Sequence, residues 1–154
     1  MQKATFAAGC FWGVEKQFSE IPGVISTRVG YTGGHSVDPG YEEVCRGTTG
    51  HAEAIEIEFD PNVIQYIDLL DIFWNIHNPT TLNRQGPDIG TQYRSAIFYH
   101  DPKQQQQAID SKNEFDKIGK YAMPITTEIA AAGKFYPAEE YHQKYLEKKG
   151  VDYC

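Results

Sequence analysis

The segment TFAAGCFWGV, residues 5–14, predicts a short buried strand that turns directly into a helix. Residues 5–8 are small or apolar, as in a core strand, and residues 11–19 have the spacing of an amphipathic helix. Two glycines flank the turn and permit backbone angles that other residues avoid. Cys10 is therefore expected at the corner where the strand ends and the helix begins.

Outward from this segment the chain alternates between strand and helix patterns. Residues 52–59 alternate strictly between apolar and polar side chains, which predicts a half-buried strand. Asp-Pro pairs at 60–61 and 101–102 predict the N-cap and first residue of two helices. Further strands are expected at 24–31, 94–99 and 125–130, with a short helix at 41–45 inside the long loop 32–50 and a polar loop at 77–92. The two helices after the Asp-Pro pairs should each bury one face, formed by Ile67, Leu70 and Trp74 in the first and by Ala108, Phe115 and Ile118 in the second, which should stop at Gly119. A last helix is expected at 137–149, closed by Gly150.

The order of these elements predicts the fold class. Strand, helix, strand, strand, helix and strand follow one another over residues 5–99, the order of the ferredoxin-like split unit. We expect an α+β fold, a ferredoxin-like α/β plait with helices packed on a mixed, mostly antiparallel sheet and with a loose C-terminal tail. No internal repeat or low-complexity linker divides the chain, which predicts a single domain over residues 1–154.

The composition argues against several classes of partner. The chain has 154 residues, 21 of them acidic and 14 basic, for a net charge of −7. This charge disfavours nucleic acid and anionic membrane surfaces, and the longest apolar runs are too short to span a bilayer. The N-terminus has no basic region followed by a long apolar run, so we expect a cytoplasmic protein.

Three cysteines, Cys10, Cys45 and Cys154, limit the covalent chemistry of the chain. They form no CxxC pair and cannot all pair with one another, so a structural disulfide framework is not expected. No cysteine or histidine pair has zinc spacing, which makes a metal site the weakest alternative. Redox chemistry or plain burial remains for each thiol.

Cys10 is the prime candidate for a nucleophile. A thiol at the start of a helix lies at the positive end of the helix dipole, which lowers its pKa and raises the thiolate fraction. Phe11 and Trp12 place a large apolar surface beside the sulfur. The alternative is an inert cysteine that is buried at the end of a core strand.

Glu53 is the candidate acid, because its position in the alternating strand matches Ile55 and Ile57 rather than the outward Glu56. A carboxyl on the apolar side loses hydration, its pKa rises, and it can donate a proton near neutral pH. The alternative is that Glu53 lies at the start of the strand, where the alternation does not hold, and faces solvent.

The two polar loops supply further candidates. Tyr41 lies in the first, and Asp88, Gln92 and Tyr93 lie in the second. Phenolic hydroxyls donate well to an oxygen that gains negative charge. The alternative is that these tyrosines pack in the core and expose only the hydroxyl.

Four segments in order resemble the peptide methionine sulfoxide reductase A family, and the match runs from Cys10 to Cys154. The resemblance implies Cys10 as nucleophile, Glu53 as acid and Asp88 as polar support. The matching segments are Gly9-Cys10-Phe11-Trp12-Gly13, Gly30-Tyr31-Thr32-Gly33-Gly34, Tyr41-Glu42-Glu43-Val44-Cys45 leading to Thr49-Gly50-His51-Ala52-Glu53-Ala54, and Asp88-Ile89-Gly90-Thr91-Gln92-Tyr93-Arg94-Ser95.

The same resemblance implies the remaining roles. Tyr41 and Tyr93 would donate hydrogen bonds to the sulfoxide oxygen, and Phe11 and Trp12 would form the pocket for the methyl group. Cys154 resembles the resolving cysteine of the family, which would form a disulfide with the nucleophile that thioredoxin reduces. Free methionine sulfoxide and oxidised proteins would be the substrates, no cofactor would be needed, and a monomer is expected. We interpret Cys45 as a buried structural thiol.

The chemistry suits these residue types. A sulfoxide is a poor electrophile until its oxygen is protonated, so attack by a thiolate requires a neutral acid. Collapse of the adduct gives methionine and a sulfenic acid on Cys10, which condenses with a second thiol to form a disulfide.

Two other functional classes remain open. A cysteine hydrolase or acyltransferase would use the same thiol with a histidine base, but the sequence ties none of the candidates to Cys10. A non-catalytic protein that binds methionine-rich segments would keep the aromatic pocket without consuming thiols. The histidines are His35, His51, His77, His100 and His142.

Overall fold

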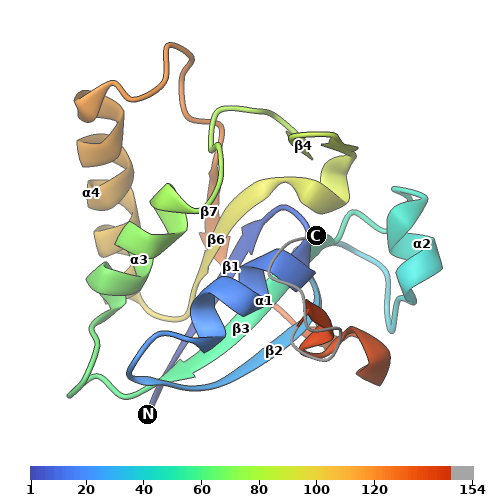
Figure 1. Cartoon of the computed structure of the whole chain (residues 1–154). Coiled ribbons are helices and arrows are strands. Elements are labelled where there is room, and N and C mark those ends of the chain that lie inside the picture. Colours follow the sequence, from blue (N-terminus) through green and yellow to red (C-terminus); the bar gives the residue numbers. More distant parts are fainter. Residues whose placement is uncertain (147–154) are drawn as a thin grey trace.

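The computed structural model describes residues 1–146, and these residues form one six-stranded mixed sheet (Figure 1). Its strands are β1 (Gln2–Ala8), β2 (Val24–Thr32), β3 (Ala52–Phe59), β6 (Ser95–Tyr99), β7 (Glu128–Ala131) and β8 (Tyr136–Pro137). They lie in the order β7-β6-β1-β3-β2-β8. Neighbouring strands are antiparallel except β6 and β7, which are parallel.

Two interleaved βαβ units explain this order. Helix α1 (Phe11–Ser19) connects β1 to β2, and β3 lies between these two strands. Helix α3 (Tyr66–Asn75) lies in the connection from β3 to β6, and β1 lies between those two strands. This interleaving is the ferredoxin-like arrangement, so the fold class predicted from the order of elements is confirmed.

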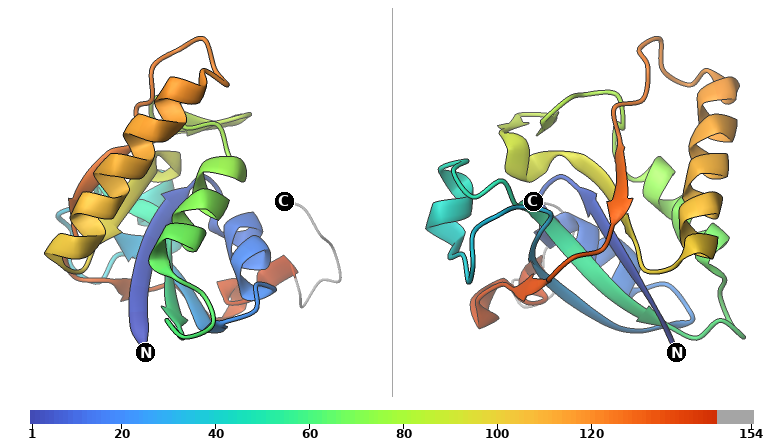
Figure 2. Two further views of the ribbon diagram at one scale, coloured as in Figure 1. Left: turned by 90° about the vertical axis from the view of Figure 1, so that its left-hand side faces the viewer. Right: turned by 180° about the vertical axis from the view of Figure 1, so that it is seen from behind.

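The helices α1 and α3 cover one face of the sheet, and α4 (Pro102–Ile118) packs against α3 and the β6–β7 edge (Figures 1 and 2). Beneath them Phe6 of β1 stacks against Phe18 of α1 and Phe73 of α3, with ring centroids 5.5 and 5.2 Å apart. Ile55 and Ile57 of β3 are fully buried in the same core. Apolar burial of this kind holds the first strand and helix together, and with them the turn that carries Cys10.

The opposite face of the sheet is covered by the chain that follows β7. This segment crosses from β7 at one edge to β8 at the other, as the view from behind shows (Figure 2). Ala132 and Phe135 of the crossing segment pack against Ala7, Ala54 and Phe98 of the sheet. Small side chains on that face of the sheet let the crossing backbone approach closely.

The helix expected directly after Asp60-Pro61 begins later, at Tyr66, so the predicted start was wrong. The carbonyl of Asp60 instead accepts two backbone hydrogen bonds that close a turn. The helical face is also rotated from the predicted one, because Ile67 is 49% exposed whereas Leu70 and Trp74 are buried.

The helix predicted after Asp101 is confirmed as α4. The carboxylate of Asp101 accepts a hydrogen bond from the backbone N–H of Gln104 at 2.7 Å, which caps the first turn. Gly119 ends the helix with a φ of +70°, a left-handed conformation that glycine adopts at little cost. Ile118, predicted to share a buried face with Phe115, is instead 73% exposed because the last turn extends past the core.

The helix expected over residues 137–149 does not form over residues 137–144. The chain forms β8 and then a single 3₁₀ turn, Glu140–His142. The open edge of β2 accounts for this, because the side-chain amide of Gln143 accepts from the N–H and donates to the carbonyl of Val29, both at 2.9 Å. Residues 147–149 of that predicted helix, its stop at Gly150 and the loose tail lie outside the described residues.

The remaining boundaries differ by a few residues. The short helix α2 (Tyr41–Cys45) forms as predicted. The predicted polar loop 77–92 contains a small hairpin, and β7 begins three residues later than expected. The hairpin strands are β4 (Arg84–Gln85) and β5 (Asp88–Ile89), and the 3₁₀ turn η1 (Thr91–Tyr93) follows them.

A buried histidine makes the stability of this fold depend on pH. His77 Nδ1 lies 2.7 Å from the carbonyl of Phe73, and its Nε2 lies 2.7 Å from the hydroxyl of Ser95, which in turn bonds to Thr127. The carbonyl can only accept, so Nδ1 carries the proton and Nε2 accepts from Ser95. Burial lowers the pKa of His77 from an ordinary 6.5 to about 4.

We expect the free energy of unfolding to fall as the pH drops from 6.5 to 4. In this range the unfolded chain binds a proton at His77 that the folded protein does not. The free energy of unfolding falls by roughly 3 kcal/mol over the whole interval as a result. Urea unfolding at pH 7 and pH 4, compared between the wild type and His77→Gln, isolates this proton. The variant should lose less stability on acidification, and an equal loss in both proteins would contradict the assignment.

Candidate functional site

The candidate nucleophile lies at the predicted corner. Cys10 is the N-cap residue of α1 and is partly exposed, one residue after the bend at Gly9. Gly9 has a φ of +98°, and a Cβ on it would lie 2.8 Å from Cγ of Gln85. The turn therefore requires glycine for both its backbone and its contact with the hairpin. The N–H groups in the first turn of α1 favour negative charge at this position.

Glu53 is buried beside this turn. Its side chain is on the helix-covered face of β3, and the residue is 1% exposed. Oε1 accepts a hydrogen bond at 3.2 Å from the backbone N–H of Phe11, the residue next to Cys10. The predicted inward direction is therefore confirmed, and the solvent-facing alternative is wrong. The sheet register and one hydrogen bond bring together a thiol and a carboxyl that are 43 positions apart in the sequence.

Three tyrosines surround this carboxyl. Tyr41 begins α2, Tyr93 ends η1, and Tyr31 lies opposite Glu53 in the β2–β3 register. Burial is the main cause that raises the pKa of each phenol well above its ordinary value near 10, and the charge of Glu53 adds to all three increases. All three hydroxyls therefore stay protonated at neutral pH and can act as hydrogen-bond donors.

Tyr31 and its partner Glu139 were not among the predicted site residues. The hydroxyl of Tyr31 donates to Oε1 of Glu139 at 3.0 Å, and the backbone N–H of Tyr41 donates to Oε2 at 3.2 Å. One carboxylate thus holds two of the tyrosine-bearing segments. The alternation of β2 could have indicated Tyr31, since it lies opposite Glu53, but no local pattern points to Glu139.

The two aromatic residues after Cys10 have different positions. Phe11 is 1% exposed and packs against Tyr31 with ring centroids 5.8 Å apart. Trp12 is partly exposed and stacks on Tyr145 at 3.8 Å. An apolar wall beside Cys10 therefore consists of a core-anchored phenyl ring and a more accessible indole.

The second polar loop also reaches the site. Asp88 lies in the hairpin close enough to Tyr93 for its charge to contribute to the raised pKa of that phenol. Gln92 is 5% exposed, and its Nε2 donates to the carbonyl of Cys45 at 3.4 Å. This contact joins the turn that carries Tyr93 to the helix that carries Tyr41.

Cys45 is not the buried structural thiol that we predicted. It is exposed at the end of α2, where only Val44 is buried, because this helix is too short to present more than one residue to the core. Its thiol is hydrogen-bonded to the hydroxyl of Tyr41. Partial desolvation raises the pKa of Cys45, while the bond from Tyr41 acts in the opposite direction. The thiol form therefore predominates at neutral pH.

The buried histidines have other partners. His51 Nδ1 accepts from the backbone N–H of Gly34 at 2.9 Å, and its Nε2 lies 2.7 Å from the carbonyl of Ser36. Both ring nitrogens of His77 are also engaged. His142 accepts from the indole of Trp12. These bonds disfavour a cysteine hydrolase, which would need a histidine available as a base.

The described residues contain no group of three or more His, Cys, Asp or Glu side chains that could hold a metal ion. Over residues 1–146, no helix is long and apolar enough to cross a membrane.

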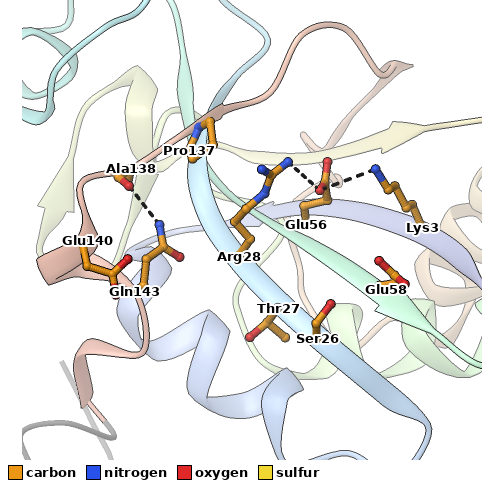
Figure 3. Close-up of a pocket in the computed structure, with 10 residues that line it drawn as sticks. All are labelled: Lys3, Ser26, Thr27, Arg28, Glu56, Glu58, Pro137, Ala138, Glu140 and Gln143. Atoms are coloured by element: carbon orange, nitrogen blue, oxygen red, sulfur yellow. Dashed lines mark hydrogen bonds and ion pairs between the residues drawn. The ribbon is translucent and has the colours of Figure 1, made fainter.

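A cleft of about 560 Å³ lies away from these residues, along β2 and the turn after β8 (Figure 3). Three of its charged groups pair with one another, since Glu56 lies 2.8 Å from Arg28 and 3.9 Å from Lys3. Among the described residues that line it, neither Cys10 nor Glu53 occurs. The cleft therefore lies apart from the candidate thiol and carboxyl.

Comparison with known proteins identifies the family. The family model described as "Peptide methionine sulfoxide reductase" matches residues 2–154. A peptide methionine sulfoxide reductase MsrA of Methanothermobacter thermautotrophicus is 61% identical over 153 residues, which cover 99% of this chain and 90% of that protein. One from Geobacter sulfurreducens is 56% identical over 154 residues, covering 100% and 95%.

Solved structures agree with this assignment. Methionine sulfoxide reductase A of Corynebacterium diphtheriae has a TM-score of 0.94 and 40% identity, covering 99% of this chain and 77% of that one. Reduced Mxr1 of Saccharomyces cerevisiae has a TM-score of 0.92 and 38% identity, covering 99% and 88%. The chain therefore belongs to the peptide methionine sulfoxide reductase family.

Proposed function

We propose that this enzyme reduces methionine S-sulfoxide, free or in proteins, with Cys10 as nucleophile and Glu53 as general acid. The observation that carries the proposal is the hydrogen bond from the N–H of Phe11 to the buried carboxyl of Glu53. This bond places Glu53, the only buried carboxyl of β3, beside Phe11, the residue that follows Cys10. Burial favours the neutral, proton-donating form of such a carboxyl.

The reaction begins with attack of the Cys10 thiolate on the sulfoxide sulfur. Glu53 transfers its proton to the sulfoxide oxygen, while the hydroxyls of Tyr41 and Tyr93 donate hydrogen bonds to that oxygen as its charge grows. Collapse of the adduct moves the oxygen to the sulfur of Cys10. Methionine sulfur gains two electrons, and Cys10 loses two and becomes a sulfenic acid.

The second half of the cycle restores the thiols. The thiolate of Cys154 attacks the sulfenic sulfur of Cys10, a disulfide forms, and the oxygen leaves as water. Cys154 lies outside the described residues, so its role rests on the family resemblance. A structure of yeast Mxr1 is described as a complex with Trx2, at a TM-score of 0.66 and 26% identity, which supports thioredoxin as the external dithiol. No bound cofactor enters either step.

We also infer the compartment and the oligomeric state of the enzyme. Three cysteines without a structural disulfide framework suit a reducing compartment, so we place the enzyme in the cytoplasm. We expect a single catalytic domain that acts as a monomer.

Only one epimer of the sulfoxide should react, and the family resemblance implies that it is the S form. The thiol, the acid and the apolar wall of Phe11 and Trp12 fix three directions around a tetrahedral sulfur, so the R epimer would direct its oxygen away from Glu53. Thioredoxin-coupled turnover of the two purified epimers measures this selectivity. We expect turnover with the S form alone, and comparable rates for both would refute the geometry.

Replacement of Cys154 by serine should stop the cycle after its first half. Cys154→Ser still reduces about one equivalent of sulfoxide per enzyme, because attack and oxygen transfer require only Cys10 and its neighbours. It then stalls with thioredoxin, which acts on the disulfide. Normal cycling of the variant, together with a Cys10–Cys45 disulfide in the oxidised wild type, would show that Cys45 resolves the sulfenic acid instead.

A further inference from the structure

His142 is a buried side chain in this region that the proposed mechanism does not use. It belongs to the 3₁₀ turn after β8 and is 1% exposed. The indole Nε1–H of Trp12 donates to its Nδ1 at 2.9 Å. Its ring also contacts Phe11 and Tyr41, with centroids 5.3 and 4.4 Å away. His142 therefore touches three of the residues assigned to substrate binding or catalysis.

The bond to Trp12 defines the tautomer of the imidazole. Because Nδ1 accepts, the proton of the neutral ring lies on Nε2. That Nε2 is buried and has no hydrogen-bond partner among residues 1–146. A buried N–H without an acceptor is unfavourable, so this orientation of the imidazole does not satisfy its own Nε2–H. Its orientation instead satisfies the indole of Trp12.

The backbone that carries His142 is firmly held. The N–H of His142 donates to the carbonyl of Glu139 at 2.9 Å, and Glu139 also holds Tyr31 and Tyr41 through its carboxylate. The side chain of the next residue, Gln143, bonds to both backbone groups of Val29. It also donates to the carbonyl of Ala138 at 3.0 Å (Figure 3). The turn is thus a rigid base for the imidazole.

We propose that His142 is a positioning residue that fixes the indole of Trp12 as the wall of the methyl pocket. This inference rests on the proposed function, which assigns Trp12 to that pocket. Trp12 is partly exposed at the start of α1, and its ring could otherwise adopt more than one rotamer. The acceptor at Nδ1 selects one of them. Burial lowers the pKa of His142, against the opposing charge of Glu139, and so keeps Nδ1 available as an acceptor.

Two substitutions separate the acceptor from the ring. His142→Phe keeps an aromatic ring but removes the acceptor, whereas His142→Asn removes the ring and keeps an oxygen near the position of Nδ1. We expect His142→Phe to raise the KM for methionine S-sulfoxide roughly two- to tenfold, the range for loss of one hydrogen bond. The saturated rate of sulfenic acid formation should change by less than about twofold. His142→Asn should restore most of the affinity.

The indole N–H signals in a nitrogen–proton NMR spectrum give a readout that is independent of turnover. The chain has two tryptophans, and Trp74 donates to Ser111 between α3 and α4, so its signal reports on folding alone. His142→Phe should shift the Trp12 signal to that of an indole N–H without an acceptor and leave the Trp74 signal unchanged. His142→Asn should change the Trp12 signal only by the loss of the imidazole that stacks on the indole, with centroids 5.6 Å apart. His100→Phe is the matched control, because it makes the same substitution at a histidine that bonds to Thr5 of β1 and not to Trp12. It should alter neither indole signal nor the KM.

The opposite pattern would overturn the inference. If His142→Phe binds sulfoxide as well as the wild type while His142→Asn binds poorly, the ring acts by packing and the acceptor is dispensable. An unshifted Trp12 signal in folded His142→Phe would lead to the same conclusion. If instead the wild type fails to reduce sulfoxide, the proposed function fails, but the NMR comparison still tests the Trp12 contact.

Discussion

Cys10→Ser is expected to lower methionine sulfoxide reduction to the uncatalysed rate while the fold stays intact. Serine is nearly isosteric with cysteine, but its hydroxyl is a far poorer nucleophile at neutral pH and cannot accept the oxygen as a sulfenic acid. The N-cap position of residue 10 involves no side-chain capping bond, so the substitution should not weaken α1. Steady-state turnover with each variant at equal concentration measures the effect.

Cys45→Ser is the matched control for this experiment. Cys45 is the other cysteine among the described residues, and it is exposed and bonded to Tyr41. A serine hydroxyl can also accept from Tyr41, so we expect activity within a few-fold of the wild type. Turnover by Cys10→Ser within a few-fold of the wild type would remove Cys10 from the mechanism.

Glu53→Gln is expected to slow sulfenic acid formation by roughly two to four powers of ten, the usual contribution of positioned proton transfer. The amide of glutamine has nearly the shape of the carboxyl and still accepts from the N–H of Phe11, so the turn around Cys10 should persist. Only the transferable proton is lost. Rapid-quench measurement of a single turnover separates this step from the later reduction of the disulfide.

The control for Glu53→Gln lies on the same strand. Glu56 points to the opposite face, where it pairs with Arg28 and Lys3, so Glu56→Gln makes the same glutamate-to-glutamine substitution without touching the site. We expect a wild-type rate in that variant. A fast burst in Glu53→Gln, with a rate unchanged across pH, would show that the proton comes from another group.

The positions of Cys10 and Glu53 could be predicted because each residue depends on local patterns. Glycines on both sides of Cys10 and the helical spacing after it define the corner, and the alternation of residues 52–59 gives the direction of Glu53. The sheet then brings the two together through the ferredoxin-like order, which follows from the sequence of elements. Local periodicity and chain order were sufficient for this half of the site.

The other half depends on tertiary contacts that no local pattern encodes. The helical spacing of residues 137–149 predicted a helix, but the edge of β2 captures the chain as β8 and bonds to Gln143. Glu139 and His142 reach the site because β8 pairs with the edge of β2 just before them. Cys45 was misplaced for a local reason, because a five-residue helix with a single buried residue leaves its last side chain exposed.

Mass spectrometry of the Cys154→Ser protein tests whether Cys10 takes the sulfoxide oxygen. The protein is treated with one equivalent of a single methionine sulfoxide epimer, then with a reagent that traps sulfenic acids, and is digested. We predict that the S epimer labels the peptide containing Cys10, with one methionine formed per label, and that the R epimer labels nothing. Label on Cys45 alone, or methionine formed while Cys10 remains an unmodified thiol, would show that Cys10 does not accept the oxygen.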